Sequence, residues 1–321
     1  MAAILSTRMI RTLAGNGEPG CTGDGGPPTQ ARLNEPKGLT VDCHGNVYVA
    51  DSENHLVRKV DRATGILSTV AGTLGGEHMH ATVQRDAAVQ LEDEDPLADD
   101  AGERSPTQFT QHADVSGTVR YWTNHAAASP KQYGGDGGPA LSAHLNFPTA
   151  VVVDREGNLY IADTMNHRVR MVDAETRIIS TVAGTGQARF SGDGGPANQA
   201  ALNEPAALAI DDEGRLYIAD QSNHRVRMVD LKTGVIQTIA GNGVATYDGD
   251  GKPAIEMALA GPSGLALVAD RLYVADTFNG RVRCVKLSSG LMTTVAGDGG
   301  VYRYESPSDA PSASLSRPTG I

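Results

Sequence analysis

The chain has 321 residues, with 38 acidic against 27 basic side chains and a formal net charge of −11. An acidic balance of this size argues against a nucleic-acid partner, because binding to phosphate backbones needs a basic face. No run approaches the roughly 18–20 apolar residues of a membrane span, and Arg8 and Arg11 interrupt the place of a signal-peptide core. A leader carried ahead of this chain would make the protein secreted or periplasmic, so the compartment stays open.

The first predicted strand is Ile4–Gly15, which matches Ser180–Gly184, the closing strand of a later unit. The phrase Leu-Asn-x-Pro then opens each unit. It occurs at Leu33, Leu145 and Leu202, with altered forms at Leu259 and Leu315. Successive steps are 112, 57, 57 and 56 residues, so one copy is unreadable after the first. Similarity at a fixed period of this size indicates a repeat fold.

Each unit reads as four short β-rich runs separated by Asp, Gly and Asn residues that favour turns. In the clearest copy the runs are Ala207–Ile210, Leu216–Ala219, Arg225–Val229 and Val235–Ile239. Gly45, Gly157 and Gly214 occupy a turn position that demands positive φ, and the last copy shortens this turn to Val268–Arg271. A four-stranded antiparallel meander at this period is typical of one blade of a β-propeller.

Residues 75–131 have the length of one blade but lack its phrases. Between Asp86 and Arg104, eight acids stand against one arginine, a net charge of −7, which is typical of a solvated or disordered segment. Only Val119–Trp122 has the character of a strand. Three interpretations stay open: a degenerate blade, a disordered acidic insertion, and a locally frame-shifted translation.

The pattern returns at Gly134 and is clearest in Tyr160–Asp173, which reads YIADTMNHRVRMVD. This stretch and its partners resemble the NHL repeat, and the intervening SGDGGPANQAALNEP resembles the long-loop NHL proteins of bacteria and the NHL region of teneurins. Matching copies cover Leu33–Gly72 and Leu145–Gly297. The resemblance implies an all-β fold in which residues 1–321 form a single NHL-type β-propeller domain.

Starts at Leu33, near residue 89, and at the four later positions predict a six-bladed plan with one degenerate blade. The chain ends with Leu315–Ile321, which matches a first strand, so we expect its two ends to meet in a closing blade. That blade would lack its two middle strands. Either the sequence is truncated at Ile321 or the last blade is incomplete, and open strand edges invite pairing with another chain.

The phrase Asp-x-x-Asn-His, followed by an arginine, spans the turn between the second and third strands. Its residues in the two clearest copies are the candidate binding residues Asp163, Asn166, His167, Arg170, Asp220, Asn223, His224 and Arg227. One interpretation is a structural bracket, in which these groups satisfy the turn backbone and pair with the arginine. The other, implied by the resemblance to NHL-like lyases that hold zinc, places His167 and His224 as metal ligands near the axis. Recurrence in every copy favours the bracket.

The phrase Gly-Asp-Gly-Gly-Pro begins at Gly23, Gly135 and Gly192, with a variant at Gly249–Pro253. It predicts a turn-rich linker from one blade to the next. A calcium site at Asp248–Asp250 is the alternative, but the acidic series of an EF-hand loop is missing. We therefore expect no resident cofactor, with calcium here and zinc at the histidines as the alternatives.

In a meander, the turn after the second strand and the linker after the fourth strand emerge on one face, the long-loop face. Asp136, Asp193 and Asp250 are expected there as binding residues, where they could form ion pairs with Arg170 and Arg227. Binding sites are usually carried by loops on a rigid scaffold. We therefore predict a non-enzymatic binding module with a protein or carbohydrate ligand on this face. The alternative is a metal-dependent lyase or hydrolase that uses channel histidines.

Overall fold

The computed structural model describes residues 10–73, 133–300, 310 and 313–320, and the backbone of residues 111–113 and 119–121. The chain divides into two compact units, Met1–Gly75 with Tyr133–Ile321, and Gly76–Gln132. In the second unit, β5 (Gln111–Ala113) pairs antiparallel with β6 (Val119–Tyr121), so β6 lies where Val119–Trp122 predicted a strand. The three interpretations of residues 75–131 remain predictions, because most of this stretch lies outside the described residues.

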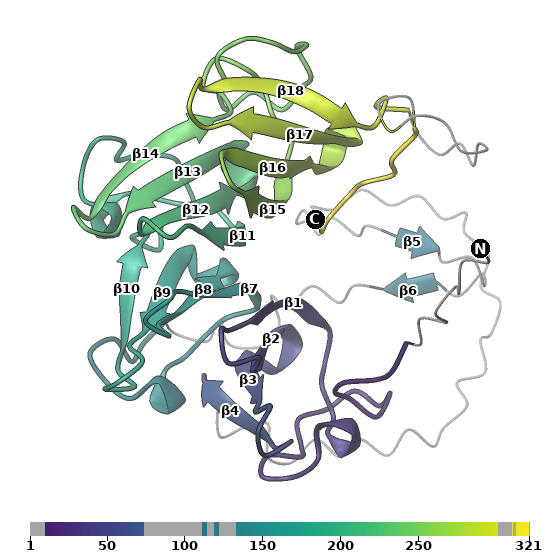
Figure 1. Cartoon of the computed structure of the whole chain (residues 1–321), viewed down its shortest axis with the longest axis vertical. Coiled ribbons are helices and arrows are strands. Elements are labelled where there is room, and N and C mark those ends of the chain that lie inside the picture. Colours follow the sequence, from purple (N-terminus) through teal and green to yellow (C-terminus); the bar gives the residue numbers. More distant parts are fainter. Residues whose placement is uncertain are drawn as a thin grey trace, which may run out of the picture. The chain divides into compact units, whose positions relative to one another are not determined.

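The first unit contains four antiparallel sheets, each built from four consecutive strands (Figure 1). Their strands are β1 (Pro36–Val41), β2 (Val47–Asp51), β3 (Leu56–Val60) and β4 (Leu67–Ala71); β7 (Pro148–Val153), β8 (Leu159–Asp163), β9 (Arg168–Val172) and β10 (Ile179–Ala183); β11 (Pro205–Ile210), β12 (Arg215–Asp220), β13 (Arg225–Asp230) and β14 (Val235–Ala240); and β15 (Pro262–Val268), β16 (Arg271–Asp276), β17 (Arg281–Lys286) and β18 (Leu291–Ala296). The prediction of an all-β fold built from NHL-type propeller blades is confirmed. The number of blades stays a prediction.

Short 3-10 turns are the only helical elements in the described residues. Those that lie wholly within the described residues are η1 (Pro28–Gln30), η2 (Ser52–Asn54), η5 (Ala140–Ser142), η6 (Thr164–Asn166), η7 (Ala197–Gln199), η8 (Gln221–Asn223) and η9 (Thr277–Asn279). Four of them, η2, η6, η8 and η9, follow the second strand of a sheet and carry the Asp-x-x-Asn phrase. The other three lie in the linkers that precede a first strand.

Burial on both faces explains why the second strands are apolar up to their final aspartate, apart from the arginine that begins β12 and β16. All five residues of β8 are buried. Leu159 and Ile161 pack with Tyr48 of the first sheet, whereas Tyr160 and Ala162 pack with the third sheet. Since successive side chains of a strand point to opposite faces, the second sheet is held between the first and the third. The small alanine lets the next sheet approach closely.

The turn between the first two strands follows the predicted backbone. Gly45, Gly157 and Gly214 have φ of 81°, 87° and 83°. In the fourth sheet, Ala269 takes the corner with φ of 49°. A left-handed alanine costs about 1 kcal/mol, so this sheet keeps the geometry of the turn at some expense in stability.

The two ends of the chain carry no strand in the described residues. Residues 1–9 lie outside them, and Ile10–Gly15 has irregular backbone. At the other end, Pro318 O accepts a hydrogen bond from Thr277 Oγ1 at 2.8 Å, just as Pro205 O accepts one from Thr164 Oγ1 at 2.8 Å. Residues 315–320 therefore lie beside the fourth sheet as a first strand would. A β-strand also needs a ladder of backbone hydrogen bonds to a neighbouring strand. Within the described residues, residues 315–320 have no such neighbour.

Candidate functional site

A buried cluster of four groups organises each repeat. In the second sheet, Asp163 Oδ1 accepts the N–H of Asn146 at 2.7 Å, and Oδ2 accepts Asn166 Nδ2 at 2.9 Å and Arg170 Nη1 at 3.3 Å. The side chains of Asp163 and Arg170 are both 0% exposed. Burial raises the pKa of Asp163 to about 6, although its hydrogen bonds and Arg170 act in the opposite direction. The cluster joins the start of the first strand to the turn, as the structural interpretation requires.

The same cluster recurs around Asp51, Asp220 and Asp276. The backbone N–H groups of Asn34, Asn203 and Ala260 each lie 2.7 Å from the respective Oδ1. In all four sheets the arginine of the third strand is at most 1% exposed. We call this set of Asp, Asn, Arg and backbone N–H the bracket.

Each bracket arginine also reaches an aspartate of the glycine-rich linker. The pairs are Arg58–Asp24 at 2.7 Å, Arg170–Asp136 at 2.6 Å, Arg227–Asp193 at 2.6 Å and Arg283–Asp250 at 3.0 Å. The predicted ion pairs of Asp136 and Asp193 are therefore present. Asp250 pairs with the arginine of its own repeat rather than with Arg170 or Arg227, because each linker lies on the sheet that follows it.

The glycine-rich linker seals the outer edge of its sheet. Gly194 N–H donates to Ile236 O at 2.8 Å, and Ile236 N–H donates to Gly195 O at 3.1 Å. Pro139 and Pro253 make the corresponding bridges to Ile178 and Leu291. An outermost strand otherwise exposes unpaired backbone groups. The Gly-Asp-Gly-Gly-Pro linker follows the fourth strand of one sheet on the long-loop face. Its glycines then lie against the outer edge of the next sheet and do not project as a free loop.

The histidine of the turn links each sheet to the next. His55, His167 and His224 accept, at Nδ1, the backbone N–H of Phe147, Glu204 and Gly261 at 2.9, 3.1 and 3.1 Å. An accepting Nδ1 specifies the neutral ring with its proton on Nε2. Burial lowers the pKa of His167 and of His224, which favours that neutral form.

Gly280 takes the place of the histidine in the fourth sheet. A Cβ at this position would lie 2.7 Å from Leu315 O. The segment of residues 315–320 therefore leaves no room for an imidazole, which explains the change in the phrase.

No three His, Cys, Asp or Glu side chains of the described residues converge on a point where they could hold a metal ion. Nδ1 of His167 and Nδ1 of His224 are each used at a different junction between sheets. Direct contact of Asp163, Asn166, Arg170 and their counterparts with a ligand stays a prediction. Among the candidate residues, the side chains of Asp136, Asp193 and Asp250 are 31%, 37% and 39% exposed.

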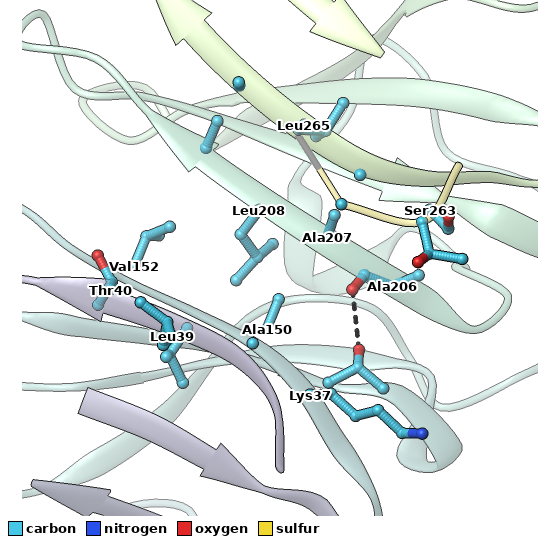
Figure 2. A pocket seen from close by; sticks show the side chains of 18 of the residues that line it. Lys37, Leu39, Thr40, Ala150, Val152, Ala206, Ala207, Leu208, Ser263 and Leu265 are labelled. Atoms are coloured by element: carbon cyan, nitrogen blue, oxygen red, sulfur yellow. Dashed lines mark hydrogen bonds between the residues drawn. The ribbon is translucent and has the colours of Figure 1, made fainter. Parts of the chain in front are cut away.

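The first strands β1, β7, β11 and β15 together line a hollow of about 850 Å³ (Figure 2). Small residues allow this approach, since a Cβ on Gly38 would lie 2.5 Å from Thr149 O. Thr149 Oγ1 donates across neighbouring strands to Ala206 O at 2.9 Å. Most other lining side chains are apolar, and Leu39 is 67% exposed.

Variable residues lie next to the starts of the first strands that line this hollow. Pro36 pairs with Asp51 and Pro205 with Asp220, so the turns lie at the end where the first strands begin, and Gln221 of η8 lines the hollow itself. The residue directly before the Asn of the turn differs in every copy: Glu53, Met165, Ser222 and Phe278. The residue before the proline is of four types in five copies and always has positive φ: Glu35, Phe147, Glu204, Gly261 and Arg317. We call these nine positions the rim.

Two rim side chains expose apolar surface, Met165 at 44% and Phe278 at 60%. Others contact one another, as where Ser222 Oγ donates to Glu204 Oε2 at 2.6 Å. The sequence prediction did not include the rim. The available signal was variation at two fixed positions within phrases whose Asp, Asn, Arg and Pro recur from copy to copy.

Two family models match the chain. One, described as the teneurin NHL domain, covers residues 11–93 and 186–246, and the other, described as the NHL repeat, covers residues 145–170. The chain belongs to the NHL-repeat family. No helix among the described residues is long and apolar enough to cross a membrane.

Several curated proteins are similar to this chain in sequence. Protein SUPPRESSOR OF QUENCHING 1 of Arabidopsis thaliana is 28% identical over 235 residues, which are 70% of this chain and 22% of that protein. NHL repeat-containing protein 2 of Bos taurus is 28% identical, covering 64% and 22%. Teneurin-4 of Mus musculus is 31% identical, covering 64% and 8%. The chain thus spans less than a quarter of the length of these relatives.

The solved structures that resemble this chain are more distant in sequence. An auxiliary nutrient binding protein from Bacteroides thetaiotaomicron has 15% identity and a TM-score of 0.46, with coverage of 94% of this chain and 69% of that one. A protein of unknown function from the same organism has 18% identity and a TM-score of 0.46, with coverage of 97% and 69%. Likeness at this level says nothing about ligand or activity.

Proposed function

We propose that this NHL propeller is a non-enzymatic binding module that takes a protein or glycan ligand on its long-loop face, at the rim and the mouth of the hollow. One observation carries the proposal. The Asp, Asn and Arg of each turn, and the His of the first three turns, satisfy one another or the backbone, whereas the rim residues vary between copies. A rigid scaffold whose buried residues recur while its surface loop residues vary is typical of proteins that bind a specific ligand.

The chemistry of the rim agrees with such a ligand. Phe278 and Met165 offer apolar contacts, while Glu35 and Lys37 form an exposed ion pair at 3.2 Å beside the hollow. Aromatic side chains flanked by polar groups are common anchors of protein interfaces. An exposed ring can also stack on the apolar face of a sugar. The proposed contact surface therefore consists of the rim and the exposed part of the first strands.

The test uses the full chain against a glycan microarray and a random peptide phage library. Selected probes should bind the wild-type protein and lose at least tenfold in affinity on Phe278→Ser or Leu39→Glu. Ile255→Ser is the matched control, since Ile255 is 55% exposed yet belongs to a linker and does not line the hollow. Probes that bind all four proteins equally, or the absence of any probe, would overturn the proposal.

Metal analysis distinguishes the enzymatic alternative. Stoichiometric zinc in the purified protein, lost in the double variant His167→Ala and His224→Ala, would favour a metal-dependent lyase or hydrolase. The binding module predicts substoichiometric zinc that does not change in this variant.

A further inference from the structure

An aromatic ring lies close to two arginines of the third strand in three of the four described repeats. The rings of Tyr133, Phe190 and Tyr247 lie 3.7, 3.8 and 3.7 Å from the guanidinium carbons of Arg168, Arg225 and Arg281, and 4.8, 4.8 and 5.1 Å from those of the bracket arginines Arg170, Arg227 and Arg283. Such contacts are electrostatically favourable, because the face of a ring is negative. In these three repeats the ring lies against the bracket arginine.

The first repeat keeps the bracket but not the ring. Cys21 stands at the aromatic position and Leu56 at that of the outer arginine, while Arg58 is retained and is 1% exposed. Cys21 Sγ lies 4.0 Å from Arg58 Nη1. Because a cysteine is much smaller than a tyrosine, a cavity of about 370 Å³ opens here, lined among others by Cys21, Leu56, Arg58 and Thr69. Among the four described repeats, the position beside the bracket arginine is thus filled by an aromatic ring in three and left open as a cavity in the first.

The polar groups that meet the hydroxyl of Tyr133 are also retained. Tyr133 Oη donates to Asp136 and lies 2.9 Å from Thr181 Oγ1. Asp24 and Thr69 occupy the same places in the first repeat, and both line the cavity. Asp24 is held in position by Arg58 Nη2 at 2.7 Å. The cavity thus presents a cation for the face of a ring and two oxygens for a hydroxyl.

We propose that this cavity binds a phenol ring from outside the chain, stacked on Arg58 with its hydroxyl on Asp24 and Thr69. The phenol can belong to a tyrosine of a partner protein or to a free phenolic molecule. None of the lining residues lines the hollow of the first strands. This site can therefore be tested independently of the ligand proposed for the rim.

The experiment titrates p-cresol into the full chain by calorimetry, with toluene and N-acetyl-tyrosinamide as further probes. p-Cresol should bind one site, and toluene several-fold more weakly, because it lacks the hydroxyl. Cys21→Tyr fills the cavity from within, so it should abolish p-cresol binding and raise Tm. Cys21→Ala keeps the cavity open and should keep the binding.

The second repeat supplies the matched control. Tyr133→Ala should open an equivalent cavity and add a second p-cresol site. Should Cys21→Tyr fail to fold, Thr69→Val provides the same test, with an expected loss of at least threefold in p-cresol affinity and no change for toluene. Binding of N-acetyl-tyrosinamide as tight as that of p-cresol indicates a peptide tyrosine as the source, and binding of p-cresol alone indicates a free phenol.

Two results would overturn the proposal. The first is equal affinity of p-cresol for the wild-type protein, Cys21→Tyr and Thr69→Val. The second is uptake of p-cresol by Tyr133→Ala at its new site only, with none at the first repeat. Neither result bears on the rim, whose Phe278 and Leu39 variants leave this cavity intact.

Discussion

The first and third repeats share one bracket and differ in what covers it. In both, a buried arginine joins the aspartate of the turn to an aspartate of the linker. Phe190 then covers the arginine of the third repeat, whereas the first repeat has Cys21 at that position and a cavity beside it. The sheets nevertheless have the same strand order. The four-stranded sheet therefore forms with the bracket alone. The aromatic ring beside the bracket arginine is not needed for it, since the first repeat lacks the ring.

Removal of the bracket arginine should have the largest effect, and an equal one in both repeats. Arg227→Ala and Arg58→Ala each leave a buried aspartate without its cation, which costs about 3–5 kcal/mol of unfolding free energy. Urea denaturation measures this loss. Arg155→Ala is the control, because the Arg155–Asp212 pair is 70% and 68% exposed and should contribute at most about 1 kcal/mol. A loss in one repeat alone would contradict the shared role of the bracket.

Truncation of the covering side chain should separate the two repeats. Phe190→Ala removes a ring that is 39% exposed and stacked on Arg225 and Arg227, so it should cost about 1–3 kcal/mol. Cys21→Ala removes only a thiol beside an existing cavity and should cost less than about 1 kcal/mol. Thermal unfolding of the two variants checks the order. Equal losses would mean that the first repeat is covered as tightly as the third.

The histidine contacts give the junctions between sheets a dependence on pH. Burial lowers the pKa of His167 and of His224, so the unfolded chain takes up protons that the folded chain resists. The stability from these residues is fully present above their unfolded pKa of about 6.5 and is lost as the pH falls towards the folded value. Protonation of Nδ1 also removes a hydrogen bond worth about 1 kcal/mol per site.

The measurement is Tm of the wild type and of the double variant His167→Gln and His224→Gln between pH 5 and pH 7.5. The wild type should lose more stability towards pH 5. The raised pKa values of Asp163 and Asp220, about 6 in each case, act in the opposite sense, because those carboxyls keep their protons longer when folded. Both proteins share that contribution, so their difference isolates the histidines. Parallel curves would show that the imidazoles do not titrate with folding.

The smallest expected effect compares the corner of the fourth sheet with that of the third. Ala269→Gly relieves a left-handed alanine with φ of 49°, although glycine also gains freedom in the unfolded chain. The net gain should be about 0.5 kcal/mol. Gly214→Ala makes the reverse change at φ of 83° and should cost about 1 kcal/mol or more. If both changes destabilise, the corner of the fourth sheet is not strained.

Local pattern was enough to locate most of the fold. The runs around Leu159–Ala162 became buried second strands, and Gly45, Gly157 and Gly214 took the positive φ that their turns predicted. The ion pairs of Asp136 and Asp193 also followed from the order of the strands. The weakest prediction was Ile4–Gly15, where the described part is irregular. A strand there depends on a ladder partner that its own residues do not specify.

The candidate site was predictable only in part. The members of the bracket were identified because they recur, and a repeated set of polar residues that all face one turn must be satisfied in the same way each time. Their neighbours at the rim were missed, since single-copy residues such as Met165 and Phe278 have no pattern of their own. Their importance came from their position beside the hollow.

The amino-acid sequence by itself determined the period, the four-stranded unit and the bracket, because alternating apolar residues and fixed turn residues act within a few positions of one another. Only the tertiary structure decided that each histidine bonds the repeat that follows it, 37 residues on in the case of His167 and Glu204. It also decided that the glycine-rich linker closes a sheet edge and that a cavity opens beside Cys21. These features depend on which surfaces meet when one sheet packs on the next, and no local spacing encodes that contact.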